Sequence, residues 1–132
     1  MDVKKRSRKL LITHHSSLIT VKKPWGKEIW WAVAPKYVGK FLVIHKDHRL
    51  SLQYHRVKHE TLYTWKGKYV MELNGRKKIQ KPGSVVVIPP GTKHRMHAKF
   101  GNVTIIEVST PEVKDVVRLE DDYGRIKIGV RG

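Results

Sequence analysis

Residues 50–67 read LSLQYHRVKHETLYTWKG. β-Branched and aromatic residues predominate on both sides of a short polar centre, and this composition indicates two strands joined by a turn. A glutamine, two histidines and a glutamate also fall within the eight positions from Gln53 to Glu60. A strand that faces only a core or only water has no need of such a set. The segment therefore indicates a candidate site as well as a local fold.

Strand-like composition continues from residue 22 almost to the end of the chain. Asn74-Gly75 lies between two short runs of alternating polarity and is the strongest short-range signal for a β-hairpin. The alternation predicts that Tyr69, Met71 and Leu73 share one face of that hairpin. Strands are predicted over residues 27–33, 36–45, 49–55, 59–65, 68–73, 76–80, 84–88, 102–109 and 125–130.

The spacing of these strands indicates the fold class. Residues 84–88 are apolar on both faces, which predicts a buried central strand, and residues 111–122 are the one stretch where a helical turn is expected. Many short strands separated by Gly, Pro and Asn are typical of a sandwich or a barrel. The sequence therefore predicts one all-β domain over residues 21–132, preceded by a basic N-terminal arm over residues 1–20.

Cysteine is absent from the 132 residues. This absence excludes a disulfide scaffold and a thiolate metal site, and it fits a reducing cytoplasm. No apolar run approaches the roughly 20 residues that span a membrane, and the apolar stretch near the N-terminus is too short for a signal peptide. We therefore expect a cytoplasmic protein with no membrane partner.

The charge balance is strongly basic, with 28 Lys and Arg against 11 Asp and Glu, or a formal net charge of +17. A field of this sign attracts polyanions and phosphorylated small molecules alike. The basic residues are spread along the whole chain, however, and no nucleic-acid-binding motif is present. Nucleic acid is therefore a possible partner but not the favoured one.

The second segment that indicates a candidate site is Gly83-x5-Pro89-x-Gly91-x2-His94, which places His94 just after a tight turn. Gln53 and His55 are two apart on a strand and leave the same face, and Glu60 returns on the neighbouring strand. Each of these four residues alone is more simply explained as a hydrogen-bonded polar side chain. Both spacings together favour a divalent-metal site with positions open for water or substrate.

The two spacings, Gln53-x-His55-x4-Glu60-x6-Gly67 and Gly83-x5-Pro89-x-Gly91-x2-His94, resemble the signature motifs of the cupin superfamily, with Gln53 in place of the usual first histidine. Four further segments resemble the type II phosphomannose isomerase domain, which follows a mannose-1-phosphate guanylyltransferase in bifunctional enzymes. The resemblance covers residues 22–125 in unbroken order. The four segments are Pro24–Gly26, Leu50–His55, Thr104–Val108 and Asp115–Arg125.

This resemblance implies a single cupin-type jelly-roll β-barrel and a metal-dependent sugar-phosphate isomerase. The reaction would interconvert mannose 6-phosphate and fructose 6-phosphate through an enediol. Partners would be a phosphorylated sugar or nucleotide-sugar and a second copy of the chain in a homodimer. The divalent ion would be Zn, Mn, Fe, Co or Ni. By resemblance its ligands are Gln53, His55, Glu60 and His94.

An isomerase also needs a base that moves the proton and cations that hold the phosphate. The candidates for the base are Glu60, His59 and His97. By resemblance, Arg118 and Tyr123 lie near the barrel mouth and contribute to catalysis. The candidates for substrate binding are Lys58, Lys93, Arg95, Asp122 and Arg125.

Three alternatives to an isomerase stay open. The family usually has Arg-x-Glu-His-Trp where this chain has Lys58-His59-Glu60-Thr61-Leu62, and this departure favours a non-catalytic cupin that binds a metal and a sugar or nucleotide-sugar. A metal site with open positions would equally serve an iron-dependent oxygenase. A nucleic-acid binder would show steep salt dependence and indifference to chelators.

Overall fold

The computed structural model of the chain describes residues 18–126. Within that range the regular secondary structure consists of antiparallel strands, with no helix. The strands are β1 (Ile19–Lys23), β2 (Gly26–Val33), β3 (Val38–Ile44), β4 (Leu52–Tyr54), β5 (Glu60–Lys66), β6 (Tyr69–Leu73), β7 (Arg76–Gln80), β8 (Val85–Ile88), β9 (His94–His97), β10 (Val103–Ser109) and β11 (Val117–Glu120).

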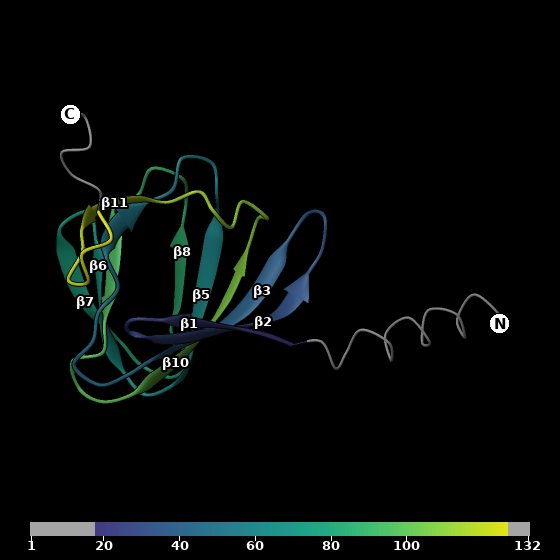
Figure 1. Cartoon of the computed structure of the whole chain (residues 1–132). Coiled ribbons are helices and arrows are strands. Elements are labelled where there is room, and N and C mark those ends of the chain that lie inside the picture. The colour runs from purple at the N-terminus through teal and green to yellow at the C-terminus, as the bar shows by residue number, and fades with distance from the viewer. Residues whose placement is uncertain (1–17, 127–132) are drawn as a thin grey trace.

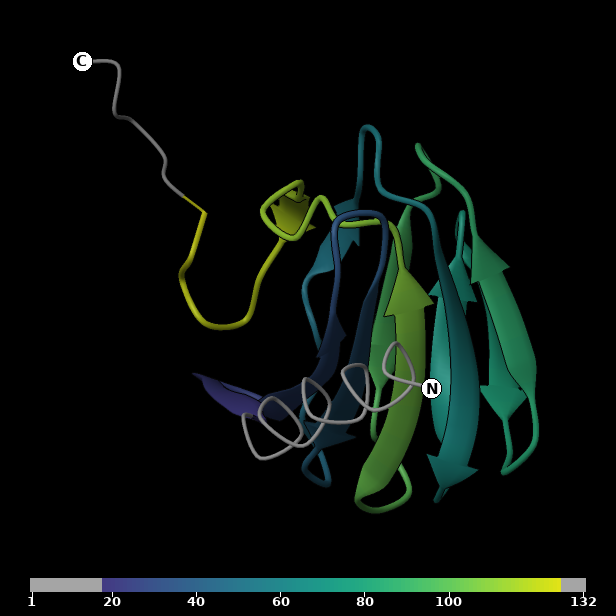
Figure 2. The same ribbon diagram turned by 90° about the vertical axis from the view of Figure 1, so that its right-hand side faces the viewer.

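The strands form two sheets (Figure 1). The larger sheet has six strands in the order β1-β2-β3-β10-β5-β8, and the smaller has five in the order β11-β4-β9-β6-β7. Consecutive strands repeatedly lie in different sheets, as in a jelly roll, and Figure 2 shows them curving around a common interior. The predicted all-β jelly-roll barrel is confirmed.

The core comes from alternate residues on the inner face of each sheet. In β3, Leu42 and Ile44 are buried while Phe41 and Val43, of the opposite parity, are partly exposed. Full burial of one such side chain stabilises the fold by about 1.5–3 kcal/mol. The buried core cluster contains Trp25, Leu42, Ile44, Leu50, Leu62, Tyr69, Met71, Val86, Ile88, Met96, Ala98, Val103 and Ile105.

Two turns require glycine or a left-handed backbone. At the hairpin between β6 and β7, Asn74 and Gly75 have φ values of 49° and 85°, and Leu73 pairs with Arg76. This is the predicted two-residue turn. At Gly26, where φ is +152°, an added Cβ would lie 1.9 Å from the carbonyl oxygen of Val43. Only glycine allows β2 to approach β3 so closely.

Strand β8 is an edge strand, so the prediction that residues 84–88 form a buried central strand is wrong. Val86 and Ile88 are buried, but Val85 and Val87 are 58% and 53% exposed. The outer face of the larger sheet is itself partly apolar, because Tyr63 on the neighbouring strand is exposed there as well. This explains why the residues on both faces of β8 are apolar. The expected homodimer stays a prediction.

The C-terminal part of the chain also differs from expectation. Residues 111–122 contain a turn followed by β11, which pairs with β4, in place of a helical turn. Residues 1–17 of the predicted arm over residues 1–20 lie outside the described residues. Its last two residues, from Ile19 onward, belong to β1. The predicted strand over residues 125–130 lies outside them from residue 127. In the described part of the chain, no helix is long and apolar enough to cross a membrane.

Candidate metal centre

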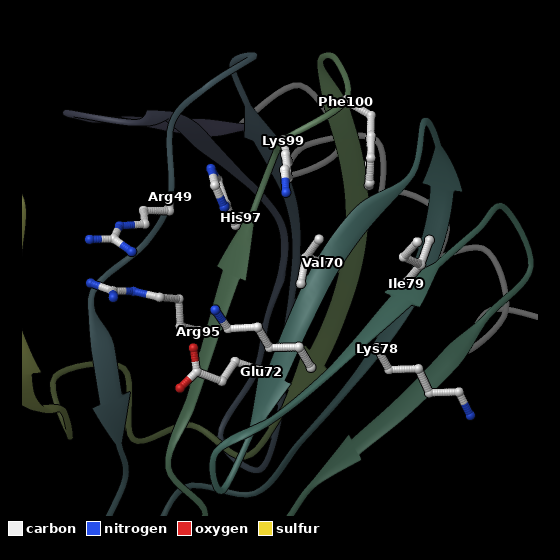
Figure 3. A pocket seen from close by; sticks show the side chains of 10 residues that line it. Arg49, Val70, Glu72, Lys78, Ile79, Arg95, His97, Lys99 and Phe100 are labelled. Atoms are coloured by element: carbon white, nitrogen blue, oxygen red, sulfur yellow. The ribbon is translucent and has the colours of Figure 1, made fainter.

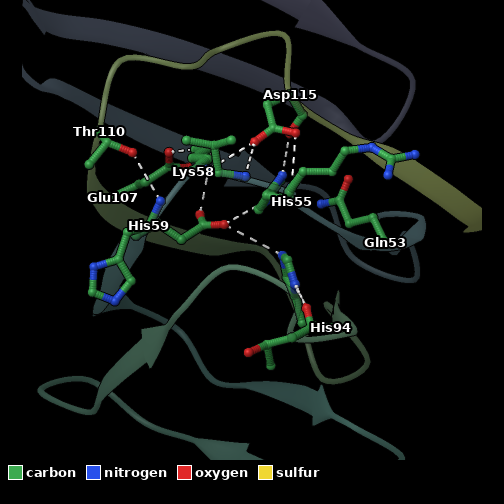
Figure 4. A network of polar contacts seen from close by, with 12 residues as sticks. Gln53, His55, Lys58, His59, His94, Glu107, Thr110 and Asp115 are labelled. Atoms are coloured by element: carbon green, nitrogen blue, oxygen red, sulfur yellow. Dashed lines mark hydrogen bonds and ion pairs between the residues drawn. The ribbon is translucent and has the colours of Figure 1, made fainter.

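Three side chains from both sheets meet inside the barrel (Figure 4). His55 follows β4, Glu60 begins β5 and His94 begins β9. One ligand atom from each lies within 4.8 Å of the other two, and all three residues are buried. The turn before β9 helps to position them, because the backbone N–H of Gly91 donates a hydrogen bond of 2.7 Å to the carbonyl oxygen of His55.

Both imidazole rings are oriented by backbone carbonyls. His55 Nδ1 lies 2.5 Å from the Asp115 carbonyl oxygen, and His94 Nδ1 lies 2.9 Å from the Thr92 carbonyl oxygen. A carbonyl only accepts hydrogen bonds, so each Nδ1 carries the proton. Each Nε2 therefore presents a lone pair to the interior, as a metal-binding imidazole does.

The lone pairs converge on the carboxylate of Glu60. Glu60 Oε2 lies 2.7 Å from His55 Nε2 and 3.5 Å from His94 Nε2. All three atoms are buried, and none has a hydrogen-bond partner among the described residues. Three buried acceptors without a donor are costly unless a cation lies between them. Their chemistry fits a divalent ion bound by two nitrogens and an oxygen.

The surrounding charges favour the states that bind a cation. Burial would raise the pKa of Glu60, but the His55 side chain and the Lys58 ammonium hold it at about 2. Burial also lowers the pKa of His94, which keeps its imidazole neutral. A metal competes with protons for such ligands, so the deprotonated carboxylate of Glu60 and the neutral imidazole of His94 lower the cost of binding.

Gln53, the fourth predicted ligand, lies beside this trio. It is directly opposite His94 in the pair formed by β4 and β9, so both side chains share the inner face. Its Oε1 accepts a hydrogen bond of 3.2 Å from Ser51 Oγ. The structure thus brings three of the predicted ligands together and holds Gln53 in the lining of an interior cavity that His55 and Glu60 also line.

Two buried lysines in ion pairs, Lys58 and Lys40, line that cavity, which has a volume of about 90 Å³. Lys58 Nζ lies 3.0 Å from Glu107 Oε2 and 3.8 Å from Glu60 Oε1. Lys40 Nζ lies 3.1 Å from Glu28 Oε1. Carboxylates of Glu107 and Glu60 raise the pKa of Lys58 although burial opposes its charge.

Sequence reasoning missed Lys40, Glu28 and Glu107. A signal for two of them exists in the alternation of their strands. Lys40 shares parity with the buried Leu42 of β3, and Glu107 shares parity with the buried Ile105 of β10. A charged residue at an inward position of an apolar strand indicates a functional or structural ion pair.

Cations gather at the mouth of the cavity. Arg118 and Lys23 line it, and Arg125 lies beside Arg118 in the adjoining hollow. Arg125 is held by Asp121 through contacts of 2.9 and 3.0 Å, whereas the buried Nε of Arg118 has no hydrogen-bond partner among the described residues. Burial and the charge of Arg125 lower the pKa of Arg118.

Asp115 fixes the loop between β4 and β5. Besides its carbonyl contact with His55, its carboxylate accepts the backbone N–H groups of Arg56, Val57 and Lys58 at 2.7–2.9 Å. These bonds hold the pKa of Asp115 at about 2 against the opposing effect of burial. Asp115 thereby positions both the candidate ligand His55 and the buried Lys58.

Several predicted site residues lie elsewhere. The His59 ring is exposed and points away from the trio in Figure 4, because it has the opposite parity to Glu60. Arg95 and His97 have the opposite parity to His94 and lie on the outer face of the smaller sheet. Arg95 there forms a 3.2 Å ion pair with Glu120. These residues do not reach the cavity.

The remaining predicted residues also make structural contacts away from the trio. Lys93 is exposed, and its N–H donates to Asn74 Oδ1 at the end of the hairpin. Asp122 pairs with Arg49 at 2.6 Å. Tyr123 donates its hydroxyl to the Arg49 carbonyl. Asp122 and Tyr123 thereby tie the C-terminal segment to Arg49, in the chain before β4.

Comparison with known proteins gives a family match and a curated relative. Residues 41–108 match the cupin domain family. Mannose-1-phosphate guanylyltransferase ManC of Salmonella typhimurium is 31% identical over 133 residues, which cover 95% of this chain and 28% of that protein. The chain therefore spans about a quarter of that relative.

Two solved structures show the same fold. KdgF from Halomonas sp. superimposes with a TM-score of 0.64 at 19% identity, over 71% of this chain and 88% of that one. Streptomyces Pac13, a nucleoside dehydratase, gives a TM-score of 0.68 at 14% identity, over 81% and 88% of the two chains. At these identities the likeness concerns the fold alone.

Proposed function

The chain belongs to the cupin family, and from that premise we propose that it is a metal-dependent sugar-phosphate isomerase. The favoured reaction is the interconversion of mannose 6-phosphate and fructose 6-phosphate. One observation carries the proposal: three buried acceptor atoms without a donor lie together, and two of their residues, His55 and Glu60, line a cavity that Arg118 and Lys23 also line. The likeness to ManC, an enzyme of mannose 1-phosphate, supports a mannose phosphate as substrate.

His55, Glu60 and His94 would hold the ion, and Gln53 would become a further ligand if its amide left Ser51. Imidazole, carboxylate and amide groups together suit Zn, Mn, Fe, Co or Ni. When bound, the ion supplies a Lewis acid that polarises the carbonyl and hydroxyl oxygens of the sugar. The other functions fall to the side chains of this chain.

The reaction removes a proton from C2 of the aldose and returns one to C1, so it needs a base in the cavity. Glu28 and Glu107 are the lining carboxylates that are not in the trio. Burial and the charge of Glu60 raise the pKa of Glu107, whereas Lys40 lowers that of Glu28 against the effect of its burial. Glu107 is therefore the stronger base, and we assign the proton transfer to it.

Lys58 has a supporting role in the same step. Its ammonium lies between Glu107 and Glu60, where it would donate to an enediolate oxygen as negative charge develops. Such a buried donor costs little reorganisation because both carboxylates already hold it in place. The phosphate would lie at the mouth, where Arg118 offers a buried unpaired Nε and Lys23 adds a charge.

The test begins with protein purified without a tag or added metal. Metal content is measured, and conversion of mannose 6-phosphate to fructose 6-phosphate is followed with and without a chelator. We expect chelator-sensitive turnover, loss of both metal and turnover in Glu60→Gln, and loss of turnover with retained metal in Glu107→Gln. Glu72→Gln, on the outer face, is the control and should behave as wild type. Turnover that survives complete metal removal would disprove the proposal.

A second candidate is a non-catalytic cupin that binds a metal and a sugar or nucleotide-sugar. Two observations favour it: the cavity is small, at about 90 Å³, and the predicted catalytic histidines His59 and His97 lie outside it. Stoichiometric metal with saturable sugar binding but no turnover in the same assay would select this candidate.

A further inference from the structure

A second hollow lies on the outer face of the smaller sheet, across β6, β7 and β9 (Figure 3). We call it the outer groove; its volume is about 280 Å³, larger than the interior cavity. Small-molecule sites begin at roughly this size. Strand pairing separates the groove from the metal centre, because its side chains leave the face of β9 opposite to His94.

Two cross-strand rows form the floor of the outer groove. In one row Val70 lies between Ile79 and His97, its directly opposite partners on β7 and β9. Phe100, in the loop after β9, adds an aromatic ring at one end (Figure 3). Ile79 and Phe100 are 48% and 43% exposed. Lys68 Nζ lies 5.0 Å from the centroid of the Phe100 ring and covers one of its faces, and the rest of the floor offers apolar surface to a ligand.

The second row and the rim are basic. Glu72 lies between Lys77 and Arg95 and is the only acidic residue that lines the groove. Arg95 forms an ion pair with Glu120, whereas Lys77 is the cross-strand partner of Glu72 and forms no ion pair among the described residues. Lys99 adjoins Phe100 and has no ion-pair partner among residues 18–126. Lys77, Lys78 and Lys99 are thus the groove cations without an ion pair among the described residues, and Lys99 is the one beside the aromatic end of the floor.

The pKa of His97 indicates the sign of the electrostatic potential in the outer groove. Burial lowers its pKa, and the charges of Arg49, Lys99 and Arg95 lower it further. A histidine that several cations keep neutral lies in a positive field. A phosphate placed there would be attracted by the same charges, and the histidine could accept or donate a hydrogen bond.

We propose that the outer groove binds a mononucleotide, with its ring system on Val70, Ile79 and Phe100 and its phosphate at Lys99. The groove combines an apolar floor with an unpaired lysine beside its aromatic end, which matches a ligand that is flat at one end and anionic at the other. A nucleic-acid polymer would need a charged track longer than this groove. The site is independent of the proposed isomerase activity.

The proposal is tested by calorimetric titration of the full chain at physiological salt. The probes are adenosine and uridine monophosphates, inorganic phosphate and a single-stranded oligonucleotide. We expect saturable one-site binding of a mononucleotide, weakened roughly tenfold in Lys99→Ala and in Phe100→Ala. Lys27→Ala, an exposed lysine on β2, and Glu60→Gln should bind as wild type. Circular dichroism checks that each variant is folded.

Four results would overturn the proposal. Absence of mononucleotide binding at millimolar concentration is the first. Equal weakening in Lys27→Ala would mean that net charge alone attracts the ligand. Loss in Glu60→Gln with retention in Lys99→Ala would place the ligand at the metal centre. Tighter binding of the oligonucleotide, or equal binding of inorganic phosphate, would mean that the groove does not recognise a mononucleotide.

Discussion

The side chains on the two faces of strand β9 lie in opposite electrostatic environments. Its inward His94 contributes a lone pair to a buried group of acceptors, while its outward Arg95 and His97 lie on a face where cations outnumber the single acidic side chain, Glu72, among the described residues that line the groove. Adjacent side chains on a strand leave opposite faces, so a single pleat separates the two environments. One short strand can therefore serve two sites without either neutralising the other.

The two faces also differ in what their charges contribute to stability. Inside the barrel, charges are shielded from water and interact strongly. Removal of one partner therefore leaves the other charge buried and unpaired, which lowers the free energy of unfolding considerably. On the outer face, water and salt screen each pair. Substitutions inside should therefore have large effects on the free energy of unfolding, and substitutions outside should have small ones.

The largest effect is expected for Lys58→Ala. This change leaves the buried carboxylates of Glu60 and Glu107 without their shared cation, and loss of one partner of a buried pair costs about 3–5 kcal/mol. Urea denaturation of chelator-treated protein measures it. Lys93→Ala, at an exposed position, should change the free energy of unfolding by less than about 0.5 kcal/mol. Equal effects of both changes would contradict the contrast between interior and surface.

Metal removal should have the next largest effect. A ligand at about 100 times its Kd stabilises the native state by about 2.7 kcal/mol, so the melting temperature should fall on treatment with a chelator. The two histidines of β9 then provide a matched pair. His94→Ala should abolish the difference between metal-loaded and metal-free protein, and His97→Ala should preserve it. A difference that depends on His97 and not on His94 would reverse our assignment of the faces.

An intermediate effect with a defined pH dependence is expected at the mouth of the cavity. Hydrogen bonds from Arg125 hold the pKa of Asp121 at about 2, below its ordinary value of 3.8. Because the folded pKa is depressed, the stabilisation is present above pH 3.8 and is lost as the pH falls toward 2. Urea denaturation at pH 6 and pH 3 should show a smaller loss of stability in Asp121→Asn than in wild type. An identical loss would show that this carboxylate does not contribute.

The smallest effect is expected for Arg49→Ala on the outer face. Its ion pair with Asp122 is about 40% exposed at both side chains, and such pairs contribute about 0–1 kcal/mol. Denaturation at low and high salt should give a small difference that shrinks further at high salt. A loss comparable with that of Lys58→Ala would mean that exposure does not separate the two classes of charge.

Local rules predicted much of this arrangement from the sequence. The turn at Asn74-Gly75 depends only on neighbouring residues, and the spacing around Glu60 and His94 was sufficient to group three of the proposed ligands. The position of β8 was not predictable in this way. A run of apolar residues looks alike in the sequence whether it forms an edge strand or a buried central strand. The difference depends on contacts with strands that are distant in the sequence.

Other details were readable but were not used. The alternation of β5 already places His59 opposite to Glu60, and that of β10 places Glu107 inside. Alternation within a strand is thus a stronger guide to site residues than proximity along the chain.

The hydrogen bonds of Asp115 with the loop between β4 and β5 bear on the order in which the candidate metal site assembles. Its bonds reach residues 55–58, which precede it by 57–60 positions. Synthesis proceeds from the N-terminus, so β4, β5 and β9 emerge before Asp115 does. A nascent chain at that stage carries the three candidate ligands His55, Glu60 and His94, yet it lacks the Asp115 carbonyl that accepts the hydrogen bond from His55 Nδ1. We expect metal loading to follow the arrival of the C-terminal segment, which makes a residue outside the trio the last component of its assembly.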